Sequence, residues 1–557
     1  MKLDIPYPRS REDIVVRELL DRRAAEHPER VFAIFEDGEV WTYADVRAKA
    51  VHVARGLAEL GVKQGDHVVS WQPTGGDAIR TWLGVNYLGA VYVPFNTAYR
   101  GGLLEHVVWL SDAKVAVVHA DLLDRLGEVK PHELQKVVTV GGPARPVPGL
   151  EVLESDALTP GAVPAPGEAA PELERTIELW DPQCLIFTSG TTGPSKGVLS
   201  PYRQLAMSSA VLYYWLGADD RILLNLPMFH ISGTSLTMRA LYTGGSVAVV
   251  EAFRTEEFWP VVRRLGVTYC LMMGSMATVL SKLPPGEDER ETPLRSVLIA
   301  PLTAEAMDFA RRVGADWYTV FNMSEIAVPL ISERNPEKIG TCGRLREGAF
   351  VRIVDDHDQP LPTGKVGEMV VRDDEPWALN LCYYKNAEAT AEAWRNGWFH
   401  TGDAVMCDDD GDFFYIDRVK DSIRRRGENI SSYEVETEVG AHPDVQEAAA
   451  IAVPSEHGED EVMVVVIPVV GRSVDPAQLV EFLVPRMAHF MVPRFVRVVD
   501  ELPRTPTMKV QKAKLRDAGV TADTFDREAA GMRLKGHRFG KAAASGAAVA
   551  AERAGGD

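Results

Sequence analysis

Residues 184–197, CLIFTSGTTGPSKG, join a short apolar run to a loop rich in hydroxyl groups and glycine. An apolar run of this length is typical of a buried strand. The loop that follows contains three glycines and Lys196. Glycine lets backbone N–H groups approach an anion closely, and lysine neutralises its charge, so this order of residues favours phosphate binding. The spacing differs from the Walker A pattern, and a plain turn is the alternative interpretation.

The sequence on both sides of this strand predicts a layered α/β fold. Segments with helical periodicity lie at 45–60, 77–88 and 103–110. Each is followed by an apolar run, at 67–71, 91–95 and 114–119 respectively. Further apolar runs follow the loop at 222–226, 246–250, 296–299 and 317–321. Such alternation predicts a parallel sheet covered by helices on both faces. Residues 155–172, rich in Pro, Ala and Gly, are expected to form a surface connection.

The pattern changes after residue 350. Short strands separated by turns, at 351–354, 366–372 and 411–416, predict an antiparallel subdomain. Beyond 418 we expect a compact α+β domain, with helices at 433–441 and 475–489 and strands at 446–453 and 462–469. The predicted division is a large N-terminal domain of stacked αβ layers plus the antiparallel subdomain over 1–417, a small mobile α+β domain over 418–520, and a partly disordered tail over 521–557.

Composition and charge restrict the class of protein. The chain has 557 residues and a formal net charge of -20. Cores stop growing at roughly 250–300 residues, so more than one domain is expected. The acidic balance disfavours nucleic acid as a partner. The longest apolar run, 462–470, is too short to cross a bilayer, and the N-terminus lacks a signal-peptide pattern, so a cytoplasmic location is expected. Five scattered cysteines fit neither a disulfide framework nor a zinc site.

Five further motifs occur in order after the phosphate-binding loop. They are LPMFHI at 226–231, FNMSE at 321–325, WFHTGD at 398–403, DRVKDSI at 417–423 followed by Gly427, and PRTPTMK at 503–509. Together they resemble the adenylate-forming superfamily of acyl-CoA synthetases, luciferases and peptide-synthetase adenylation domains. The resemblance covers about residues 12–517. Over 372–403 it is nearest to carnitine- and crotonobetaine-CoA ligases.

The resemblance implies a role for each motif in a two-step reaction. The small domain first presents Lys509 for adenylation, then rotates about the hinge Lys420 and brings the Gly427 region to the CoA thiol. Lys509, Glu325, Lys196 and His230 are the candidate catalytic residues, with Glu325 as the magnesium ligand. The implied ATP and CoA contacts are Thr188, Ser189, Gly190, Thr191, Thr192, Gly193, Lys196, Phe321, Asn322, Met323, Ser324, Asp403, Arg418, Arg424 and Gly427.

Elementary chemistry supports several of these roles. Joining a carboxylate to ATP brings two anions together, so the site needs cations such as Lys196, Lys509 and a Glu325-bound Mg²⁺. An ionised Asp403 can accept hydrogen bonds from ribose hydroxyls, and the Arg418 guanidinium suits ribose and phosphate oxygens. His230 is either a core histidine or a wall of the acyl pocket, and we favour the pocket. The run 424–426, three arginines, is either a solvated face or a CoA phosphate contact, and both interpretations stay open.

Four departures from the family pattern lie on the nucleotide side. Leu298-Ile299 stands where the family has Gly-Gly, Phe321-Asn322 replaces Tyr-Gly, Ser324 replaces Thr, and Met508 replaces the glycine before Lys509. Close backbone approach is lost without glycine. One hypothesis is therefore an enzyme that adenylates poorly and mainly transfers a pre-formed acyl-adenylate to CoA. The alternative is an acyl pocket reshaped for an unusual acid.

The sequence predicts an AMP-forming acyl-CoA ligase that uses ATP or acyl-AMP, Mg²⁺ and coenzyme A. Its substrate is expected to be a hydrophobic carboxylic acid, with natural-product biosynthesis or lipid metabolism as the setting. Transfer to a carrier protein, a non-enzymatic adenylate-binding protein and a homodimer are left open. The candidate pocket lining is largely apolar, and methionine adapts to irregular shapes. It consists of His230, Met272, Met273, Met276, Leu298, Ile299, Ala300 and Met323.

Overall fold

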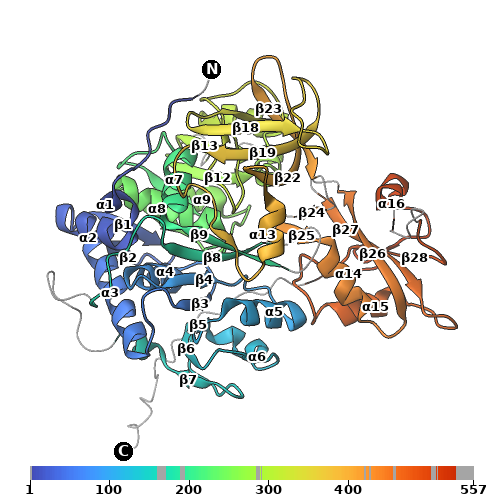
Figure 1. The fold of residues 1–557 in the computed structure, drawn as a ribbon, viewed down its shortest axis with the longest axis horizontal. Coiled ribbons are helices and arrows are strands. Elements are labelled where there is room, and N and C mark those ends of the chain that lie inside the picture. The colour runs from blue at the N-terminus through green and yellow to red at the C-terminus, as the bar shows by residue number, and fades with distance from the viewer. Residues whose placement is uncertain are drawn as a thin grey trace, which may run out of the picture.

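The computed structural model describes residues 3–159, 171–188, 195–283, 286, 289, 291–418, 422–425, 428–455, 460–503, 510, 512–532 and 534. The structure consists of two α/β sheets, an antiparallel subdomain and a smaller C-terminal domain (Figure 1). None of the helices in these ranges is long and apolar enough to cross a bilayer.

The first sheet has eight strands in the order β20-β9-β8-β4-β3-β5-β6-β7. Strands β3 to β8 run parallel, whereas β9 and β20 are antiparallel additions at one edge. Its strands are β3 (His67–Trp71), β4 (Val91–Pro94), β5 (Val115–His119), β6 (Lys136–Val140), β7 (Glu151–Leu153), β8 (Pro182–Thr188), β9 (Lys196–Pro201) and β20 (Cys382–Tyr383).

The second sheet has seven strands in the order β14-β13-β12-β10-β11-β1-β2. All of its pairs are parallel except β1 with β2. Its strands are β1 (Val31–Phe35), β2 (Val40–Thr42), β10 (Arg221–Leu224), β11 (Ser246–Val249), β12 (Tyr269–Met273), β13 (Ser296–Ala300) and β14 (Asp316–Tyr318).

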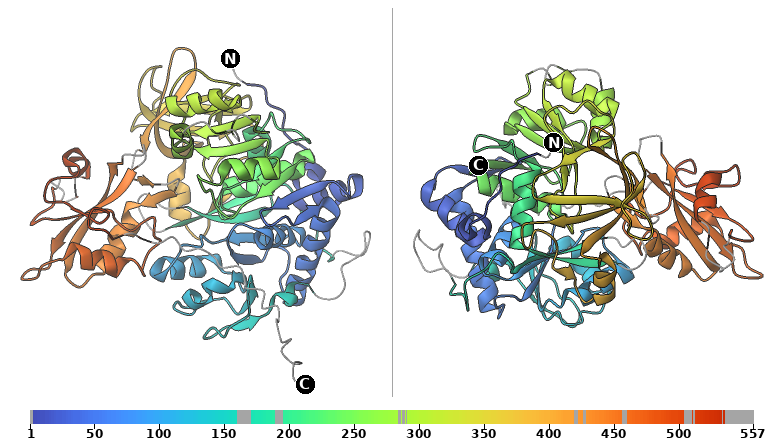
Figure 2. Two further views of the ribbon diagram at one scale, coloured as in Figure 1. Left: turned by 180° about the vertical axis from the view of Figure 1, so that it is seen from behind. Right: turned by 45° about the horizontal axis from the view of Figure 1, so that its top comes forward.

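Helices fill the space between these sheets and cover their outer faces (Figure 2). One hydrophobic core takes side chains from both sheets and from the helices between them, so the large domain is layered as α-β-α-β-α. The inner helices are α2 (Val16–Glu26), α3 (Tyr43–Glu59), α4 (Gly76–Tyr87), α7 (Tyr202–Leu212) and α8 (Ile231–Thr243). The outer helices are α5 (Gly101–Ser111), α6 (Leu123–Leu126), α9 (Phe258–Leu265), α10 (Gly274–Lys282) and α12 (Ala304–Val313).

Local sequence accounts for several of these helices. Thr42 and Asp45 form a reciprocal capping box that starts α3. In α9 the buried side chains Phe258, Val261, Val262 and Leu265 recur at helical spacing. That helix ends at Gly266, whose φ of +65° is left-handed, so a glycine suits the position.

The antiparallel subdomain closes around its own apolar core. Its strands are β15 (Val320–Phe321), β16 (Leu330–Ile331), β17 (Thr341–Leu345), β18 (Ala349–Val354), β19 (Gly367–Asp373), β21 (Trp394–Arg395), β22 (Trp398–Cys407) and β23 (Asp412–Arg418). Shorter elements elsewhere in the N-terminal part are α1 (Arg11–Ile14), η1 (Ala120–Leu122), η2 (Ser155–Leu158) and α13 (Ala387–Ala393).

The C-terminal domain begins with a hairpin and continues as a four-stranded sheet with three helices in its described part. Ala98 and Leu103 of the large domain pack against its core, so the two domains share an apolar contact. Its elements are β24 (Ser422–Arg425), β25 (Glu428–Ser431), α14 (Ser432–Gly440), β26 (Val445–Pro454), β27 (Asp460–Pro468), α15 (Pro476–Leu483), β28 (Phe495–Val498), α16 (Lys512–Ala518) and β29 (Phe525–Asp526).

The predicted fold class, a large α/β N-terminal domain with a smaller C-terminal domain, is confirmed. Three details differ from the predicted elements. The run 317–321 divides between β14 and β15, which belong to different sheets. The helix expected over 475–489 ends at Leu483, because Pro485 has no backbone N–H with which to continue the helical hydrogen bonds. Strand β29 pairs with β28 inside the segment predicted as tail.

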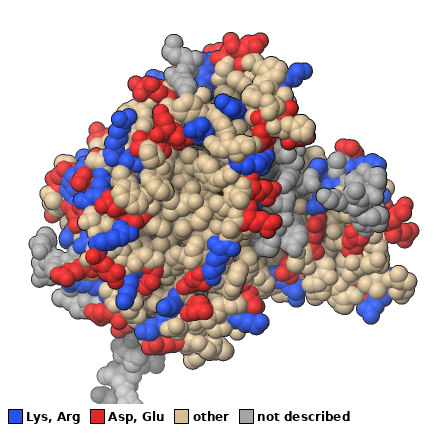
Figure 3. Space-filling view, in the orientation of Figure 1, with Lys and Arg blue, Asp and Glu red and all other residues tan. Residues whose placement is uncertain are grey.

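The negative charge is distributed over the surface. On the face in Figure 3, acidic and basic side chains are interspersed around the margin of a broad uncharged centre.

Candidate active site

A cavity of about 1160 Å³ lies where the two sheets, the antiparallel subdomain and the C-terminal hairpin meet. Asn225, Glu251 and Met273 line it from the carboxyl ends of β10, β11 and β12. Ligands of open parallel sheets bind at this edge, because the loops that carry polar groups gather there.

On one side of the cavity, the ends of the phosphate-binding loop are held together. The Ser195 hydroxyl lies 3.1 Å from the Thr188 carbonyl oxygen and donates to it. The ring Nε2 of His106 lies 2.9 Å from the Ser195 carbonyl, which can only accept, so His106 is the donor. These contacts fix the base of the loop from which Lys196 extends.

Lys196 and Glu325 are connected through Tyr383. The Lys196 ammonium lies 4.8 Å from the centre of the Tyr383 ring, a cation–π distance. The Tyr383 hydroxyl donates a 2.9 Å hydrogen bond to Oε1 of Glu325, and both side chains are buried. One aromatic side chain therefore orients both the basic and the acidic group of the cavity.

The loop that carries Glu325 is held from behind by a buried arginine. Arg346 donates to the carbonyls of Ala327 and Val328, each at 2.9 Å, and forms an ion pair with Asp373. Val328 has a φ of +36°, an unfavourable value for a β-branched residue. Its amide donates to Oδ1 of Asn322 at 3.1 Å. Arg346 and Asn322 thus stabilise a strained turn that places Glu325 at the cavity.

His230 stands on the opposite side, at the N-cap of α8. The first turn of this helix packs tightly against the preceding segment, since a Cβ on Gly233 would lie 2.3 Å from the Pro227 carbonyl oxygen. Apolar side chains complete the wall beside His230; they are Phe229, Ile231, Leu271, Met273, Met276 and Val279.

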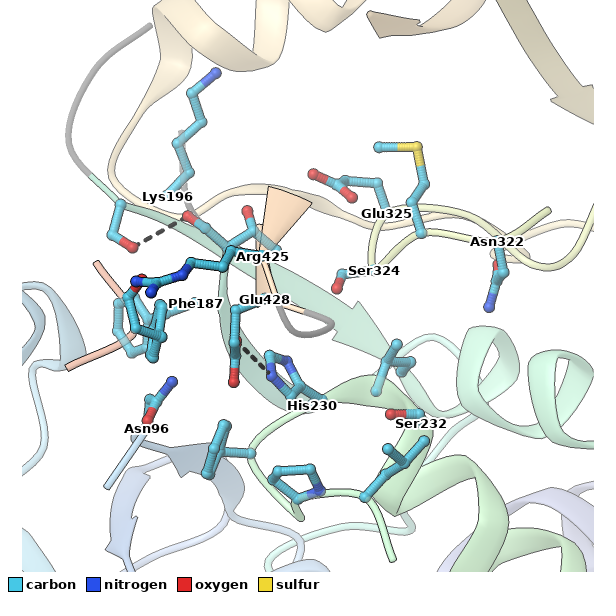
Figure 4. Close-up of a pocket in the computed structure, with 18 of the residues that line it drawn as sticks. Asn96, Phe187, Lys196, His230, Ser232, Asn322, Ser324, Glu325, Arg425 and Glu428 are labelled. Carbon is cyan, nitrogen blue, oxygen red and sulfur yellow. Dashed lines mark hydrogen bonds and ion pairs between the residues drawn. The ribbon is translucent and has the colours of Figure 1, made fainter. Parts of the chain in front are cut away.

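The C-terminal domain contributes Glu428 to this wall. Its Oε2 lies 3.0 Å from Nε2 of His230, and Figure 4 shows the two side chains facing each other. In that view Lys196 and Glu325 lie above the pair, and Asn96 and Ser232 lie below it. Burial alone lowers the pKa of His230, but the Glu428 carboxylate outweighs burial and raises it. The hairpin is therefore joined to the His230 wall of the cavity by an ion pair.

Arg425, one of the three consecutive arginines, is structural in this arrangement. It is buried, forms an ion pair with Glu461 at 2.7 Å, and donates to the carbonyls of Phe490 and Val492. Of the two interpretations of the run, the solvated face does not apply to this member.

Nine of the residues predicted to form the site line this cavity. The lining includes Thr188, Lys196, His230, Met273, Met276, Asn322, Met323, Ser324 and Glu325. Asp403 is buried beside the lining residues Thr401 and Gly402, and its backbone pairs with that of Arg418 across β22 and β23.

Several predicted lining residues require correction. Met272, Leu298, Ile299 and Ala300 do not line the cavity. Side chains alternate along a strand, so Leu271 and Met273 meet the cavity while Met272 packs with Ile299 in the outer core. Phe321, a predicted ATP or CoA contact, lies in the core of the antiparallel subdomain and does not line the cavity. Apolar character alone does not show on which face of a strand a residue lies, so the sequence could not distinguish cavity-lining residues from core residues.

Other predicted site residues lie outside the described part of the chain. These are Ser189, Gly190, Thr191, Thr192, Gly193, Lys420, Gly427, Met508 and Lys509, together with the side chains of Arg418 and Arg424.

The sequence analysis missed Tyr383 and Glu428. Glu428 directly follows Gly427 of the hinge motif, so its position in the motif was a usable signal. Tyr383 lies in a pair of tyrosines 58 residues after Glu325, and no local pattern connects the two.

The layered α/β domain, the antiparallel subdomain and the small C-terminal domain meet at a cavity that has polar and apolar lining residues. This arrangement is that of a two-domain enzyme of the nucleotide-dependent ligase type. The family model described as AMP-binding enzyme matches residues 20–384, and the AMP-binding enzyme C-terminal domain matches residues 434–509. The chain belongs to the AMP-binding enzyme family. The predicted class, an AMP-forming acyl-CoA synthetase of the adenylate-forming superfamily, is confirmed.

Curated relatives span nearly the whole chain. Sulfoacetate–CoA ligase of Cupriavidus necator is 31% identical over 506 residues, which cover 89% of this chain and 96% of that protein. Crotonobetaine/carnitine–CoA ligase of Salmonella paratyphi A is 27% identical and covers 90% of this chain and 98% of its own length. Among solved structures, the amide bond synthetase McbA of Marinactinospora thermotolerans aligns with a TM-score of 0.77 at 25% identity, over 90% of this chain and 99% of that one.

Proposed function

We propose that this chain activates a carboxylic acid with ATP as an acyl-adenylate and transfers the acyl group to the thiol of coenzyme A. The observation that carries the proposal is one continuous cavity, which is lined at one side by Thr188, Lys196 and Glu325 and at the other by His230 and apolar side chains. A nucleotide and an acyl group can meet only if their subsites join, and a single cavity supports such an arrangement.

The chain's own residues divide the work of such a reaction. Lys196, held over Tyr383, neutralises phosphate charge during adenylation. Asp403 and Arg418 are assigned to the ribose, Lys509 to adenylation and Lys420 to the hinge, as the resemblance implies. The Glu428–His230 pair holds the hairpin beside the acyl subsite, where thiol attack expels AMP.

Glu325 fits a role as the protein ligand of Mg²⁺. The described residues contain no group of three or more His, Cys, Asp or Glu side chains that could hold a metal ion. A protein site with a single carboxylate matches the preference of Mg²⁺ for one or two carboxylates plus substrate phosphates. When bound, the ion would neutralise phosphate charge, and Tyr383 would keep Glu325 oriented toward it.

For the acid we propose a molecule with an apolar body. Leu271, Met273, Met276, Phe229 and Val279 are apolar residues that line the same cavity as His230. The names of the curated relatives specify small polar acids, so the substrate is the part of the proposal that most needs a direct test.

The thioesterification-only alternative loses part of its support. Leu298 and Ile299, which stand in place of two glycines, are buried in the cores on either side of β13 and do not intrude into the cavity. Met508 remains as a reason to test adenylation separately.

A panel of acids tests the proposal. Purified protein is incubated with ATP, Mg²⁺ and each acid, and pyrophosphate release and CoA thioester are measured separately. We expect both products with apolar acids, and thioester only when CoA is added. Thioester from supplied acyl-adenylate without pyrophosphate release from the acid would establish the alternative. Product only with a loaded carrier protein or an amine acceptor would refute the assignment to CoA.

A further inference from the structure

Strand β22 leaves its regular pairing with β19 where the predicted ribose-binding segment lies. Glu368 pairs with Ala404 and Val370 pairs with His400, so one residue of β19 faces three residues of β22 between these pairs. The three are Thr401, Gly402 and Asp403. Such an insertion is a β-bulge, which redirects side chains and interrupts the ladder of hydrogen bonds. Gly402 lies at its centre with a φ of +71°, a left-handed value that favours glycine.

Side-chain hydrogen bonds hold the bulge at 401–403 where ladder bonds are interrupted. The Gly402 amide donates to Oε1 of Glu368 at 3.0 Å. The Thr401 hydroxyl donates to the Met369 carbonyl at 2.7 Å and accepts from the Asp403 amide at 3.2 Å. Backbone N–H groups of a folded protein need an acceptor. Glu368 supplies it for Gly402, the residue directly before Asp403.

The Glu368 carboxylate is itself held in place. Its Oε2 lies 3.0 Å from Nδ1 of His400 and 3.3 Å from Nη2 of Arg395. Asp358 forms further ion pairs with Arg395 at 3.5 Å and with His400 at 3.8 Å. The His400 side chain is buried, so it cannot turn away from this cluster. The carboxylate therefore keeps Oε2 on the two basic groups and Oε1 on the bulge.

The held segment borders the cavity. Asp403 belongs to it and is 3% exposed. A side chain enclosed to this degree takes its direction from the backbone, so the bulge determines where the Asp403 carboxylate lies. Hydrogen bonds weaken steeply as their geometry departs from the ideal, so a shifted bulge would weaken the bonds that Asp403 accepts from a ligand. The cavity-lining residues of the cluster are Glu368, Arg395, His400, Thr401 and Gly402.

We propose that Glu368 is a positioning residue for the ribose of the bound nucleotide, which holds the bulge at 401–403 and thereby directs Asp403 at the ribose hydroxyls. His400 and Arg395 support it by fixing its carboxylate. Glu368 lies on a neighbouring strand, outside the motif at 398–403 that predicts the ribose role. The inference rests on the proposed function, to which the ribose role of Asp403 belongs.

Nucleotide binding tests the inference without the unidentified acid. Dissociation constants of ATP and of 2′,3′-dideoxy-ATP are measured by calorimetry with the full chain and Mg²⁺. The ratio of the dideoxy value to the ATP value reports the ribose hydroxyls, since the two nucleotides carry the same base and phosphates. In wild type we expect a ratio of about 10 to 150, the range for a hydrogen bond to a charged group.

Three variants separate the hydrogen bond from the charge. Glu368→Ala removes the acceptor of Gly402 and should lower the ratio at least about fivefold. Glu368→Gln keeps an oxygen that can accept from Gly402 and gains a nitrogen that can donate to His400, so it should restore the wild-type ratio. Glu388→Ala removes a carboxylate from an exposed position on α13 and should match wild type. A Glu368→Ala ratio within about twofold of wild type would overturn the proposal. A Glu368→Gln ratio as low as that of Glu368→Ala would do the same.

The Gly402 amide reports on the bulge itself, without any nucleotide. Its hydrogen exchange should be faster in Glu368→Ala than in wild type and in Glu368→Gln, because only the alanine variant lacks the acceptor. If Glu368→Ala does not fold, Glu368→Met, which keeps the length of the side chain without an oxygen, takes its place. Equal exchange of this amide in all the proteins would show that Glu368 does not hold the bulge.

Asp403→Asn separates the inference from the proposed function. An unchanged ratio in this variant would refute the ribose role of Asp403 and the inference together. A lower ratio in Asp403→Asn with an unchanged ratio in Glu368→Ala would refute the inference alone. Lower ratios in both variants, in a protein that makes no thioester with any acid, would support the inference and refute the proposed ligase activity.

Discussion

Removing one hydroxyl group, in Tyr383→Phe, should impair adenylation without unfolding the protein. The Tyr383 hydroxyl donates to Oε1 of Glu325 at 2.9 Å, where Tyr383 is 8% and Glu325 is 5% exposed. A hydrogen bond to a charged group contributes about 1.5–3 kcal/mol. Each 1.36 kcal/mol corresponds to a tenfold change in rate, so kcat/KM for ATP should fall by about 10-fold to 150-fold. The phenyl ring retains the face on which Lys196 lies, so only the bond to Glu325 is removed.

The assay is pyrophosphate release as a function of ATP and Mg²⁺ concentration. Tyr384→Phe is the matched control, since its hydroxyl donates to Asp112 instead of Glu325. A double-mutant cycle with Glu325→Gln should show a coupling energy above about 1 kcal/mol, because the two side chains act together. If Tyr383→Phe stays within twofold of Tyr384→Phe, or if the cycle is additive, Tyr383 does not orient Glu325 and the reasoning is refuted.

Three further changes test other contacts. Glu428→Gln should lower the pKa of His230, because the carboxylate is what raises it, so a His230 NMR titration that does not move would contradict the ion pair. In wild type, the ion pair stabilises the docked small domain at low pH. This stabilisation is lost as the pH rises through the raised pKa of His230. Gly233→Ala forces a Cβ against the Pro227 backbone and should destabilise the protein by about 1–3 kcal/mol, whereas Gly217→Ala, which has open space and no positive φ, should shift the melting temperature little. Arg346→Met leaves Asp373 buried without its partner and should lower the free energy of unfolding by about 3–5 kcal/mol in urea titration, with partial recovery on adding Asp373→Leu; no recovery would show that the Arg346 bonds to Ala327 and Val328 dominate.

The sequence was most informative where the local pattern and the tertiary structure agree. The run 67–71 is β3 without change of bounds, because an apolar strand buried on both faces needs only its own hydrophobicity to be recognised. Periodicity failed at 317–321, which is uniformly strand-like but leaves one sheet after Tyr318 and enters another at Val320. Leu271 and Met272 are both apolar, but their side chains lie on opposite faces of β12. Only the register of the strand shows that Leu271 lines the cavity and Met272 does not.

Long-range contacts were beyond the sequence pattern. His230 and Glu428 are 198 residues apart, and they meet only through the docking of two domains. Among the described motifs, the one at 226–231 follows β10, whose carboxyl end reaches the cavity, and those at 321–325 and 398–403 lie in the antiparallel subdomain beside it. Which partner each side chain takes there depends on packing that no short motif encodes.

The cavity is bounded by residues of both domains of the chain. Glu428 lies on a hairpin of the C-terminal domain, and Ser455, Asp460, Phe490 and Met491 of the same domain also line the cavity. Mutagenesis of the large domain alone, aimed at a new preference for the acid, would leave this part of the cavity lining unchanged. A chimaera that exchanges only the small domain with a relative would alter the shape and charge of the acid's surroundings while every residue of the layered sheets stays the same. Under the proposed function, exchanging the small domain alone is therefore expected to change the selectivity for the acid.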